Sequence, residues 1–471
     1  MEKFKEYNQK QGIFRSIIPG ELLENDHPAR IIDRVVERLD LEELYNEYSE
    51  EGCPAYHPKM MLKVLFYSYM TGMMSCRGMW DNLRYRADYI FLSGDQVPDF
   101  RTINRFRQTA RQSLKKLFTQ IVMICVELDL VDFQYLAIDG QKIQANANYR
   151  KSTNKKRYTK TVKKVQAGME KLLSEEISDD FTEEHRNKKL STLQKQKEIL
   201  DDYQQIIEAM DESDTINLTD NEAKIMNHKN GTKLPSYNHQ SAVDGKHGIT
   251  VAVQTTTEAF DHGHHLLPLV DQAKENTKGQ FQKVLADSGF CDFERLIETQ
   301  RREEEYYLPD RDYQKKYTKD HLFTQQQFLQ NERGQWICPA GREMKSKGRI
   351  TRKDGVPVSL FMGQGCENCE LKPKCTKGKN RQIGIDARDQ YRQRMRERLQ
   401  TDRGRSIYSK RQAIVESPHG HDQKNIGWKQ HHLRGVKNAA SEFILIRIGS
   451  NLGKIARYGA QSLCKMVPQF S

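Results

Sequence analysis

The sequence contains two short apolar runs that each end in an aspartate, and these runs decide the fold. The first is Phe133-Gln-Tyr-Leu-Ala-Ile-Asp139-Gly140, and the second is Lys283-Val-Leu-Ala-Asp287, which Ser288-Gly289 follows. An Asp-Gly pair between two strand-like runs is a strong hairpin signal, so we expect a turn at Asp139-Gly140. Because a further strand signal at 240–257 and later helical segments alternate along the chain, the sequence predicts a mixed α/β sheet.

The two aspartates are candidates for a metal site. If their strands are neighbours, Asp139 and Asp287 meet at the carboxyl edge of the sheet, where paired carboxylates can hold two divalent ions about 3.5–4 Å apart for phosphodiester chemistry. Oxygen ligands suit Mg²⁺. A third carboxylate completes such a site, and Glu416, in a helical segment flanked by cations, is the candidate. The alternative, that each aspartate only forms a turn, stays open on spacing alone.

The composition narrows the class of protein. The chain has 471 residues, 37% hydrophobic and 30% charged, with a mean hydropathy of −0.82, which is polar but not typical of a disordered chain. The excess of 76 Lys and Arg over 64 Asp and Glu, a net charge of +12, favours a polyanionic partner. The apolar stretch 60–74 is too short for a bilayer span, and the N-terminus lacks a secretion signal. We therefore expect a cytoplasmic protein without membrane contact.

Residues 20–130 have the spacing of several short helices. Asp99 or Thr102 can cap one of them, and Arg101, Arg105 and Arg107 lie around this helix start. Short helices that carry arginines are typical of a helix-turn-helix-like DNA-binding module. A helical bundle with a solvated basic face is the alternative.

Two further segments have an unusual charge pattern. Residues 150–214 are highly charged, with apolar positions at three-four spacing on either side of a break at 178–181, which predicts an antiparallel helical hairpin. Residues 341–410 hold 19 Lys and Arg against 8 Asp and Glu, a net of +11. We expect this basic stretch to follow DNA phosphates, with binding that weakens steeply as salt increases.

The cysteines suggest a metal site and not a disulfide framework. Their number, nine, is odd, and the chain is long and has no secretion signal. Cys366 and Cys369 have the spacing of a metal knuckle, Cys375 follows them, and Cys338 precedes them in a Cys-Pro-Ala-Gly run. Four thiolates can close a structural Zn²⁺ site in a small, core-poor segment. Four reduced thiols in a basic loop are the alternative.

Two weaker motifs are discounted. The run Asp261-His-Gly-His-His265 contains metal-ligand residue types, but a polar loop before a helix is the favoured interpretation. The run Gly449-Ser-Asn-Leu-Gly-Lys454 has one residue too few between its glycines for a phosphate-binding loop, so an ATPase function is not supported.

Short motifs follow one another along nearly the whole chain. In chain order they are Tyr56-His-Pro-Lys-Met-Met-Leu62, Ser75-Cys-Arg77, Pro98-Asp-Phe-Arg-Thr-Ile-Asn-Arg-Phe-Arg107, Ile138-Asp-Gly-Gln-Lys-Ile-Gln-Ala-Asn146, Tyr237-Asn-His-Gln240, Val243-Asp244, Ala286-Asp-Ser-Gly-Phe290, Tyr408-x-x-Arg411, Val415-Glu416, Leu433-Arg-Gly435 and Glu442-Phe443. In this order and number the motifs resemble those of bacterial insertion-sequence transposases of the DDE class, and in particular the group designated IS eleven-eighty-two.

The resemblance implies a reaction and a site. The reaction is DNA cleavage at the ends of a mobile element by water, followed by transfer of the freed 3′-hydroxyl into target DNA, with two Mg²⁺ ions. By resemblance, Asp139 and Asp287 bind the ions and Glu416 completes the shell of one. Tyr408 and Arg411 contact the DNA backbone. The implied partners are the terminal inverted repeats and target DNA, bound by a homodimer that is nucleoid-associated when on DNA.

The expected fold class is an α/β protein with an RNase H-like mixed-sheet core, an N-terminal all-helical domain, a helical-hairpin insertion and a Cys-containing, zinc-ribbon-like insertion. The expected boundaries are 15–130 for the helical DNA-binding domain, 131–149, 215–325 and 385–460 for the split core, 150–214 for the hairpin, and 326–384 for the basic Cys-cluster insertion.

One segment departs from the family pattern. After the glutamate the family continues with proline, a hydrophobic residue, Phe-Gly and a lysine on the same helix, whereas this chain has Ser417-Pro-His-Gly-His-Asp-Gln-Lys424. Pro418 and Gly420 disfavour a long continued helix. Two other functions therefore stay open: a catalytically inactive DNA-binding protein derived from a transposase, which does not nick DNA, and a DDE-type nuclease, which cuts without end specificity or strand joining.

Overall fold

The computed structural model describes residues 18–48, 54–174, 182–212, 214–313, 322–352 and 355–466. The chain folds into two compact units, Met1–Leu130 with His421–Ser471, and Val131–Gly420. The break that we expect at 178–181 lies outside the described residues.

The first unit is helical. Pro28 and Pro58 occupy first-turn positions of their helices. Of the two cap candidates for α6 (Phe100–Thr109), Asp99 is the one that caps it, because it accepts a hydrogen bond from the backbone N–H of Thr102 at 2.7 Å. Its elements are η1 (Pro19–Leu22), α1 (Pro28–Glu37), α2 (Glu42–Tyr45), α3 (Pro58–Met70), α4 (Cys76–Tyr85), α5 (Ala87–Ser93), α6 (Phe100–Thr109), α7 (Leu114–Glu127), α15 (Val436–Lys454), η7 (Ile455–Gly459) and α16 (Ala460–Met466).

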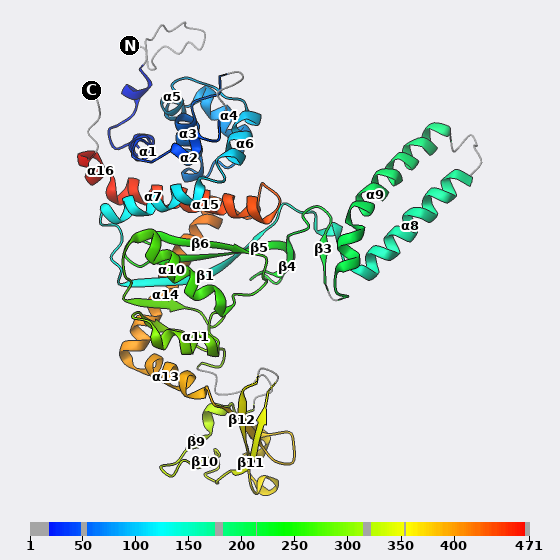
Figure 1. The fold of residues 1–471 in the computed structure, drawn as a ribbon, viewed down its shortest axis with the longest axis vertical. Coiled ribbons are helices and arrows are strands. Elements are labelled where there is room, and N and C mark those ends of the chain that lie inside the picture. The colour runs from blue at the N-terminus through cyan, green and yellow to red at the C-terminus, as the bar shows by residue number, and fades with distance from the viewer. Residues whose placement is uncertain are drawn as a thin grey trace, which may run out of the picture. The chain divides into compact units, whose positions relative to one another are not determined.

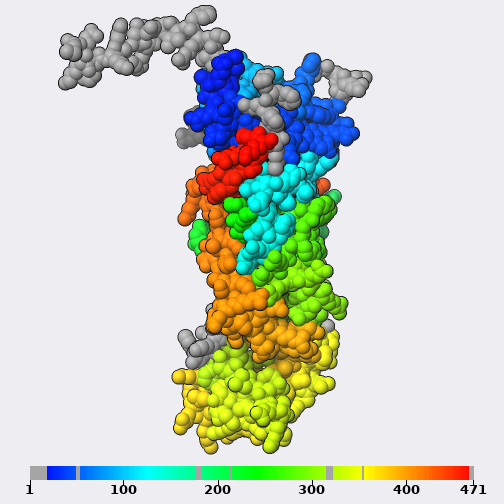
Figure 2. All heavy atoms as spheres, turned by 90° about the vertical axis from the view of Figure 1, so that its left-hand side faces the viewer, coloured from blue at the N-terminus to red at the C-terminus, as the bar shows by residue number. Residues whose placement is uncertain are grey.

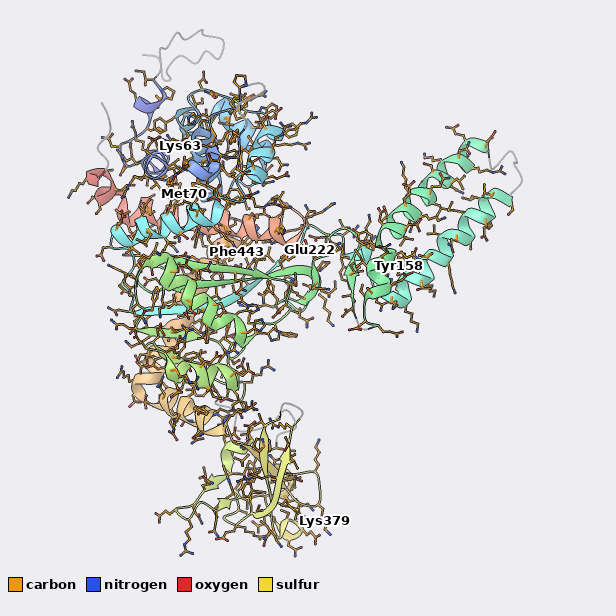
Figure 3. The ribbon with its side chains drawn as sticks, viewed as in Figure 1. Lys63, Met70, Tyr158, Glu222, Lys379 and Phe443 are labelled. Carbon is orange, nitrogen blue, oxygen red and sulfur yellow. The ribbon has the colours of Figure 1, made fainter. Side chains whose placement is uncertain are left out.

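Helix α15 is the centre of this unit. It packs against α3 and α7 and is buried along most of its length, including its charged residues Glu442 and Arg447. Gly449 permits the approach to α3, since a β-carbon there would lie 2.8 Å from the backbone nitrogen of Met70. Figure 3 labels Met70 on α3 and Phe443 on α15. The last helix, α16, contacts the first α-helix, α1. Figure 2 shows this red C-terminal segment beside the blue N-terminal one.

The core of the first unit also contains buried charges. The carboxylate of Glu442 lies 2.8 Å from Nδ1 of His431 and 2.7 Å from Nδ1 of His432. Burial raises the pKa of Glu442, but the two histidines outweigh burial and hold the pKa at about 2. The guanidinium of Arg447 contacts Asp422, and both side chains are fully buried. These contacts tie the segment at 421–432 to α15.

The second unit is built on a mixed sheet. Strand β1 pairs antiparallel with β5 and parallel with β7, and β7 pairs parallel with β8. The order is β4-β5-β1-β7-β8, and β6 also pairs with β5 (Figure 1). The strands are β1 (Tyr135–Gln144), β4 (Lys224–Asn227), β5 (Lys233–Asp244), β6 (Thr250–Thr256), β7 (Lys283–Ala286) and β8 (Glu305–Tyr307). The mixed α/β sheet predicted from the sequence is confirmed.

Helices and short turns accompany this sheet. Helix α10 packs against β6, β5 and β1, and α11 packs against α13. The elements are η3 (Gly263–His265), α10 (Leu266–Thr277), α11 (Phe293–Glu298), η4 (Thr299–Arg301), α13 (Asp389–Gln400) and α14 (Asp402–Lys424). Long helices α8 (Lys155–Ser174) and α9 (Glu183–Ala209) pack on each other, next to η2 (Tyr149–Lys151) and the paired strands β2 (Ser152–Thr153) and β3 (Ile216–Asn217). Tyr158, labelled in Figure 3, donates its hydroxyl hydrogen bond to the carbonyl of Leu200 at 2.9 Å between these helices.

A small sheet with its own apolar cluster lies between β8 and α13 in the sequence. The cluster consists of Phe323, Phe328, Met344, Cys375 and Ile383. Its elements are η5 (Gln325–Gln327), β9 (Leu329–Gln330), β10 (Trp336–Ile337), β11 (Lys345–Thr351), β12 (Pro357–Met362), η6 (Cys366–Asn368), α12 (Lys372–Cys375) and β13 (Gln382–Asp386). Strands β11, β12 and β13 pair in that order, and β9 pairs with β10.

Replacing the buried carboxylate with Glu442→Gln is expected to reduce stability in a pH-dependent way. Because the folded pKa of Glu442, about 2, is below its ordinary value of 4.5, the ionised group stabilises the fold above pH 4.5 and loses this effect as the pH falls through 2. The effect at neutral pH is about 3 kcal/mol. Urea unfolding of both proteins at about pH 6 and about pH 3 measures it. A difference in unfolding free energy that is the same at both pH values would contradict this account.

Candidate active site

The structure brings the two sequence-predicted aspartates together. Asp139 lies in β1, and Asp287 directly follows β7. Because these strands are parallel neighbours with Ile138 opposite Ala286, the next residue on each strand is an aspartate at the same edge of the sheet. The apolar runs before them are fully buried, which fixes the strands and thereby the positions of both carboxylates.

The hairpin predicted at Asp139-Gly140 is wrong. Strand β1 continues through both residues to Gln144, with Gly140 opposite Gln240 of β5. The glycine serves a different purpose, since a β-carbon on Gly140 would lie 2.1 Å from Oδ1 of Asp261. The glycine therefore leaves room for another acidic side chain directly over the strand.

Asp261 is a carboxylate that the sequence reasoning did not assign to the site. It lies in the loop between β6 and α10, and its Oδ1 accepts hydrogen bonds from Nδ2 of Asn238 at 2.9 Å and Nε2 of Gln240 at 3.4 Å. Asp139, Asp261 and Asp287 each contribute an oxygen, and these oxygens lie within 4.8 Å of one another. In the sequence, Asp261 begins the His-rich run 261–265, but the spacing of that run does not predict that Asp261 lies over β1.

The three carboxylates repel one another in a largely buried setting. Burial raises the pKa of Asp139 to about 6, with the Arg411 guanidinium opposing and Asp287 reinforcing the shift. Burial also raises the pKa of Asp261, against its hydrogen bond from Asn238. A divalent cation relieves this repulsion, and a set of carboxylate oxygens is the donor set that Mg²⁺ prefers. The residues present therefore fit a site for hard divalent cations.

Helix α14 supplies basic groups beside the cluster. Nη1 of Arg411 lies 3.7 Å from Oδ1 of Asp139, and Nδ1 of His419 lies 3.8 Å from its Oδ2. The ring of Tyr408 is half-buried, and its pKa is raised by burial, with Arg411 opposing and Asp287 reinforcing the shift. Lys410 donates a hydrogen bond to the hydroxyl of Tyr135 at 3.0 Å, which fixes α14 to the start of β1.

The third carboxylate predicted from the sequence lies elsewhere. Glu416 is exposed on α14 and accepts a hydrogen bond from Nε2 of Gln412 at 3.0 Å. Within the described part of the chain, it is not in the group of carboxylates that includes Asp139. The sequence predicts that this helix ends early, but α14 continues through Pro418 and Gly420 to Lys424. Pro418 is buried, and a β-carbon on Gly420 would meet no atom within 4 Å.

An open cavity of about 580 Å³ adjoins the acidic cluster. Its lining contains both acidic and basic side chains, so it can receive a charged, extended ligand such as a phosphate backbone beside Asp287. The lining residues are Asp287, Ser288, Pro309, Asp310, Arg311, Tyr313, Arg405, Tyr408, Ser409 and Arg411.

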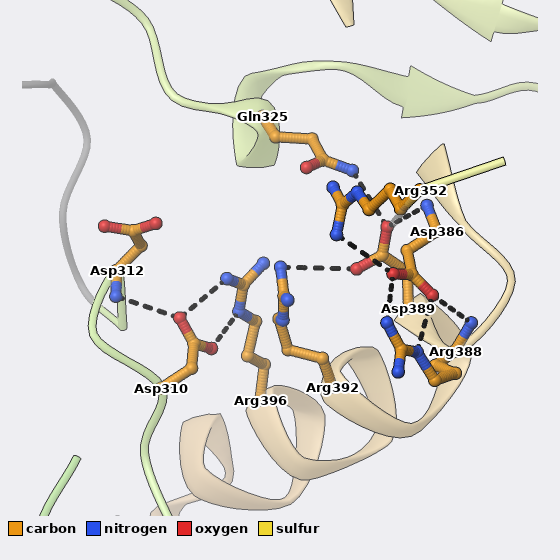
Figure 4. Close-up of polar contacts among 9 residues, drawn as sticks. All are labelled: Asp310, Asp312, Gln325, Arg352, Asp386, Arg388, Asp389, Arg392 and Arg396. Carbon is orange, nitrogen blue, oxygen red and sulfur yellow. Dashed lines mark hydrogen bonds and ion pairs between the residues drawn. The ribbon is translucent and has the colours of Figure 1, made fainter. Parts of the chain in front are cut away.

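Many arginines of the basic stretch 341–410 are used inside the protein. Arg396 donates a hydrogen bond through Nη2 to Asp310 at 2.8 Å, and Arg388 pairs with Asp386 at 2.8 Å (Figure 4). Arg392 pairs with Asp389 at 3.2 Å. The fully exposed strand β11 carries Lys345, Lys347 and Arg349. Of these three pairs, only Arg396–Asp310 reaches an acid outside the stretch, because the acids of the other two pairs are already counted in its net charge.

The four cysteines of the sequence cluster lie around one small cavity. Cys338, Cys366, Cys369 and Cys375 all line it, and all are free thiols. Burial raises the pKa of Cys375, Arg381 opposes this, and the other three cysteines reinforce it. Among the described residues, these cysteines do not form a group whose ligand atoms all lie within 4.8 Å of one another, as the three aspartates do.

The arginines expected to contact DNA in the first unit differ in exposure. Arg101 and Arg105 are exposed on α6. Arg107 is buried, where it donates hydrogen bonds to the hydroxyl of Tyr69 at 3.3 Å and to Asn104 at 2.8 Å.

Aromatic rings lie among the exposed arginines of α4 and α6. The guanidinium of Arg84 lies 3.7 Å from the ring centre of Trp80, and that of Arg77 lies 5.1 Å from the ring centre of Phe100. The two rings meet edge to face at 6.1 Å. On this surface the guanidinium groups can bind phosphates, and the aromatic rings hold the guanidinium groups in place.

Comparisons with known protein families identify the class of protein. A model described as "Transposase domain (DUF772)" matches residues 19–109, and a model described as "Transposase DDE domain" matches residues 337–456. Both matches are to transposase domains, which indicates a DNA transposase of the polynucleotidyl transferase type and of the insertion-sequence DDE class. Searches of the curated proteins and of the solved structures find no match.

The matched segments contain only part of the site. Glu416 and the four cysteines lie within the DDE match, whereas Asp139, Asp261 and Asp287 lie between the two matches. The acidic cluster is thus an observation independent of the family models. Within the described ranges, no helix combines the length and apolar character that a membrane span requires.

The variant Gly140→Ala is expected to displace Asp261, because its new β-carbon would lie 2.1 Å from Oδ1 of that residue. Overpacking of this kind costs about 1–3 kcal/mol. The DNA transposase activity of the variant should fall at least about tenfold, which corresponds to about 1.4 kcal/mol in the barrier. Gly453→Ala in α15, where the nearest atom lies 3.7 Å away, is the matched control. Equal cleavage rates for Gly140→Ala and wild type would contradict the assigned role of this glycine.

Proposed function

We propose that this transposase cuts DNA at the ends of its element and transfers the freed strands into target DNA, in a reaction that depends on Mg²⁺. The observation that carries the proposal is the convergence of Asp139, Asp261 and Asp287 at one edge of the sheet. Divalent ions at such a site supply activation of the attacking oxygen and charge stabilisation at the leaving oxygen of a phosphodiester.

We further propose that the mixed sheet of the second unit is an RNase H-like core. Its central strand β1, antiparallel to β5 and parallel to β7, supports this assignment, as do Asp139 within β1 and Asp287 directly after β7. The boundaries expected for the split core, which include 385–460, stay a prediction. The compact units group residues 421–460 with the N-terminal helices instead.

In the proposed reaction, the chain's own groups hold and orient the DNA. Arg411 and Tyr408, next to the acidic cluster, are placed to bind the phosphate that flanks the scissile bond. Water attacks the phosphodiester and releases a 3′-hydroxyl. This hydroxyl then attacks a phosphodiester of the target, and the 3′-oxygen of the target strand leaves as the new bond forms. Arg101 and Arg105, with the aromatic surface of α4 and α6, are proposed to bind the terminal repeats. The burial of Arg107 favours a packing role for that residue. A homodimer on DNA stays part of the proposal.

Glu416 stays the predicted carboxylate that completes the shell of one ion. Glu416 is exposed, accepts a hydrogen bond from Gln412, and lies on the same helix as Arg411 and His419. Asp261 is proposed as an additional ligand, on the strength of its position beside Asp139 and Asp287. Because Glu416 lies on α14 and Asp261 in the loop between β6 and α10, single substitutions can test the two proposed ligands separately.

Substituting the carboxylates is expected to remove Mg²⁺-dependent cleavage of DNA that carries the element ends. Asp139→Asn and Asp287→Asn should each lower the rate on the order of 10²-fold or more, because several kcal/mol of charge stabilisation are lost. Glu416→Gln should lower it comparably, and Asp261→Asn should raise the Mg²⁺ concentration needed for half-maximal rate.

The matched control is Glu397→Gln, since Glu397 is an exposed helical glutamate that accepts a hydrogen bond from Gln393 four residues before it, at 3.1 Å. It should cleave like wild type. Wild-type cleavage by Glu416→Gln would remove Glu416 from the site. Cleavage without end specificity or joining in the wild type would favour a nuclease, and DNA binding without any nicking would favour an inactive DNA-binding protein.

We also propose that Cys338, Cys366, Cys369 and Cys375 hold a structural Zn²⁺ ion. Four thiols around one cavity support this, because thiolates are the ligands of closed structural zinc sites. Double substitution of Cys366 and Cys369 by serine should remove one equivalent of zinc from protein purified without chelators and lower the melting temperature. Cys125→Ser, at a buried cysteine of the other unit, is the control and should retain the zinc. Wild-type protein that contains no zinc would refute the assignment.

A further inference from the structure

A second group of metal-ligand side chains lies on the loop that presents Asp261. The loop joins β6 to α10 and contains Glu258, His262, His264 and His265. Its sequence alone favours a polar loop before a helix. None of these four side chains has a part in the proposed DNA reaction.

The three histidines converge on one carboxylate. Nε2 of His265 lies 3.1 Å from Oε2 of Glu258, and Nε2 of His264 lies 3.3 Å from Oε1. Nε2 of His262 lies 3.6 Å from Oε2. One ligand atom each from Glu258, His264 and His265 lies within 4.8 Å of the others. The same ring nitrogen of each histidine thus faces a common point beside the carboxylate.

The local packing holds these groups in place while leaving them accessible. The ring of His265 is buried, whereas His262, His264 and Glu258 are each between 38% and 54% exposed in their side chains, so an ion can enter from solvent. The rings of His262 and His264 stack at 5.5 Å, and those of His264 and His265 lie 4.0 Å apart. Gly263 fits closely against Asp292, where a β-carbon would lie 1.9 Å from Oδ2, and this contact fixes the middle of the loop.

The donor set distinguishes this group from the acidic cluster. Imidazole nitrogens together with a carboxylate oxygen suit Zn²⁺ and similar transition metals, whereas Mg²⁺ prefers oxygen alone. The nearby cation Arg295 is paired with Glu294 at 2.8 Å and with Glu298 at 3.1 Å, which limits its repulsion of a metal ion.

We propose that Glu258, His264 and His265, joined by His262, bind one transition-metal ion of the Zn²⁺ type, at a site separate from the acidic cluster and from the cysteines. The ion would tie both ends of the 258–265 segment together. Since Asp261 lies in the middle of this segment, the bound ion holds the loop that positions Asp261 over Gly140. This second consequence rests on the proposed function, whereas the binding site itself does not.

The test is the zinc stoichiometry of the full chain, measured without DNA. Chelator-stripped protein is titrated with Zn²⁺ in excess Mg²⁺, which occupies the acidic cluster. Wild type should bind one more equivalent of Zn²⁺ than the double variant Glu258→Gln/His264→Gln. Both side chains are partly exposed, so the substitutions are expected to leave the fold intact. His185→Gln, at an exposed histidine of α9 that contacts Thr182, should bind as wild type does. Equal zinc content in wild type and the double variant would overturn the proposal and leave a hydrogen-bonded cluster only.

X-ray absorption of zinc-loaded wild type gives a second measurement that needs no variant. The expected spectrum contains nitrogen and oxygen ligands in addition to any sulfur ligands from the cysteines. A spectrum with sulfur ligands alone would overturn the proposal. Both results are independent of DNA cleavage, so an inactive transposase with the extra zinc equivalent would refute the proposed function while supporting this site.

Discussion

The parallel pairing of β1 with β7 is the constraint on which the rest of the second unit depends. It places Ile138 opposite Ala286, and the two aspartates that follow at one edge of the sheet. The apolar side chains of residues 136–138 and 284–286 are buried, and their burial stabilises this register. A shift of one residue would turn Asp139 to the other face of the sheet and separate it from Asp287.

Three aspartates in contact are unfavourable without compensation, and the surrounding groups provide part of it. Asn238 and Gln240 donate hydrogen bonds to Asp261, and Arg411 and His419 lie within 4 Å of Asp139. Burial nevertheless raises the pKa of Asp139 to about 6. A fold that places like charges together against this cost is typical of a functional site. The transposase class explains the cost, since its substrate is a phosphodiester and its chemistry needs a concentrated acidic site.

The sequence predicted the parts of the site that follow from local pattern. Asp139 and Asp287 could be predicted because each ends an apolar run, and parallel neighbours bring such ends together. Asp261 could not, because its position depends on a loop folding over Gly140, which no local spacing records. The predicted hairpin failed for the same reason: the Asp-Gly signal is a turn signal, but here the glycine makes room for a distant side chain. Charge counting likewise could not reveal that Arg388 and Arg396 are paired internally, or that Arg107 is buried.

The central claim is that Asp139, Asp261 and Asp287 share divalent ions, and metal-directed backbone cleavage tests it directly. Fe²⁺ replaces Mg²⁺, and with ascorbate and peroxide it generates radicals that cut the chain next to the bound ion. Mass spectrometry then locates the cuts. The account predicts cuts near all three aspartates, which lie far apart in sequence, and their suppression by excess Mg²⁺. Cuts confined to the His-rich segment 258–265 or to the cysteine region, with none near Asp139 and Asp287, would contradict it.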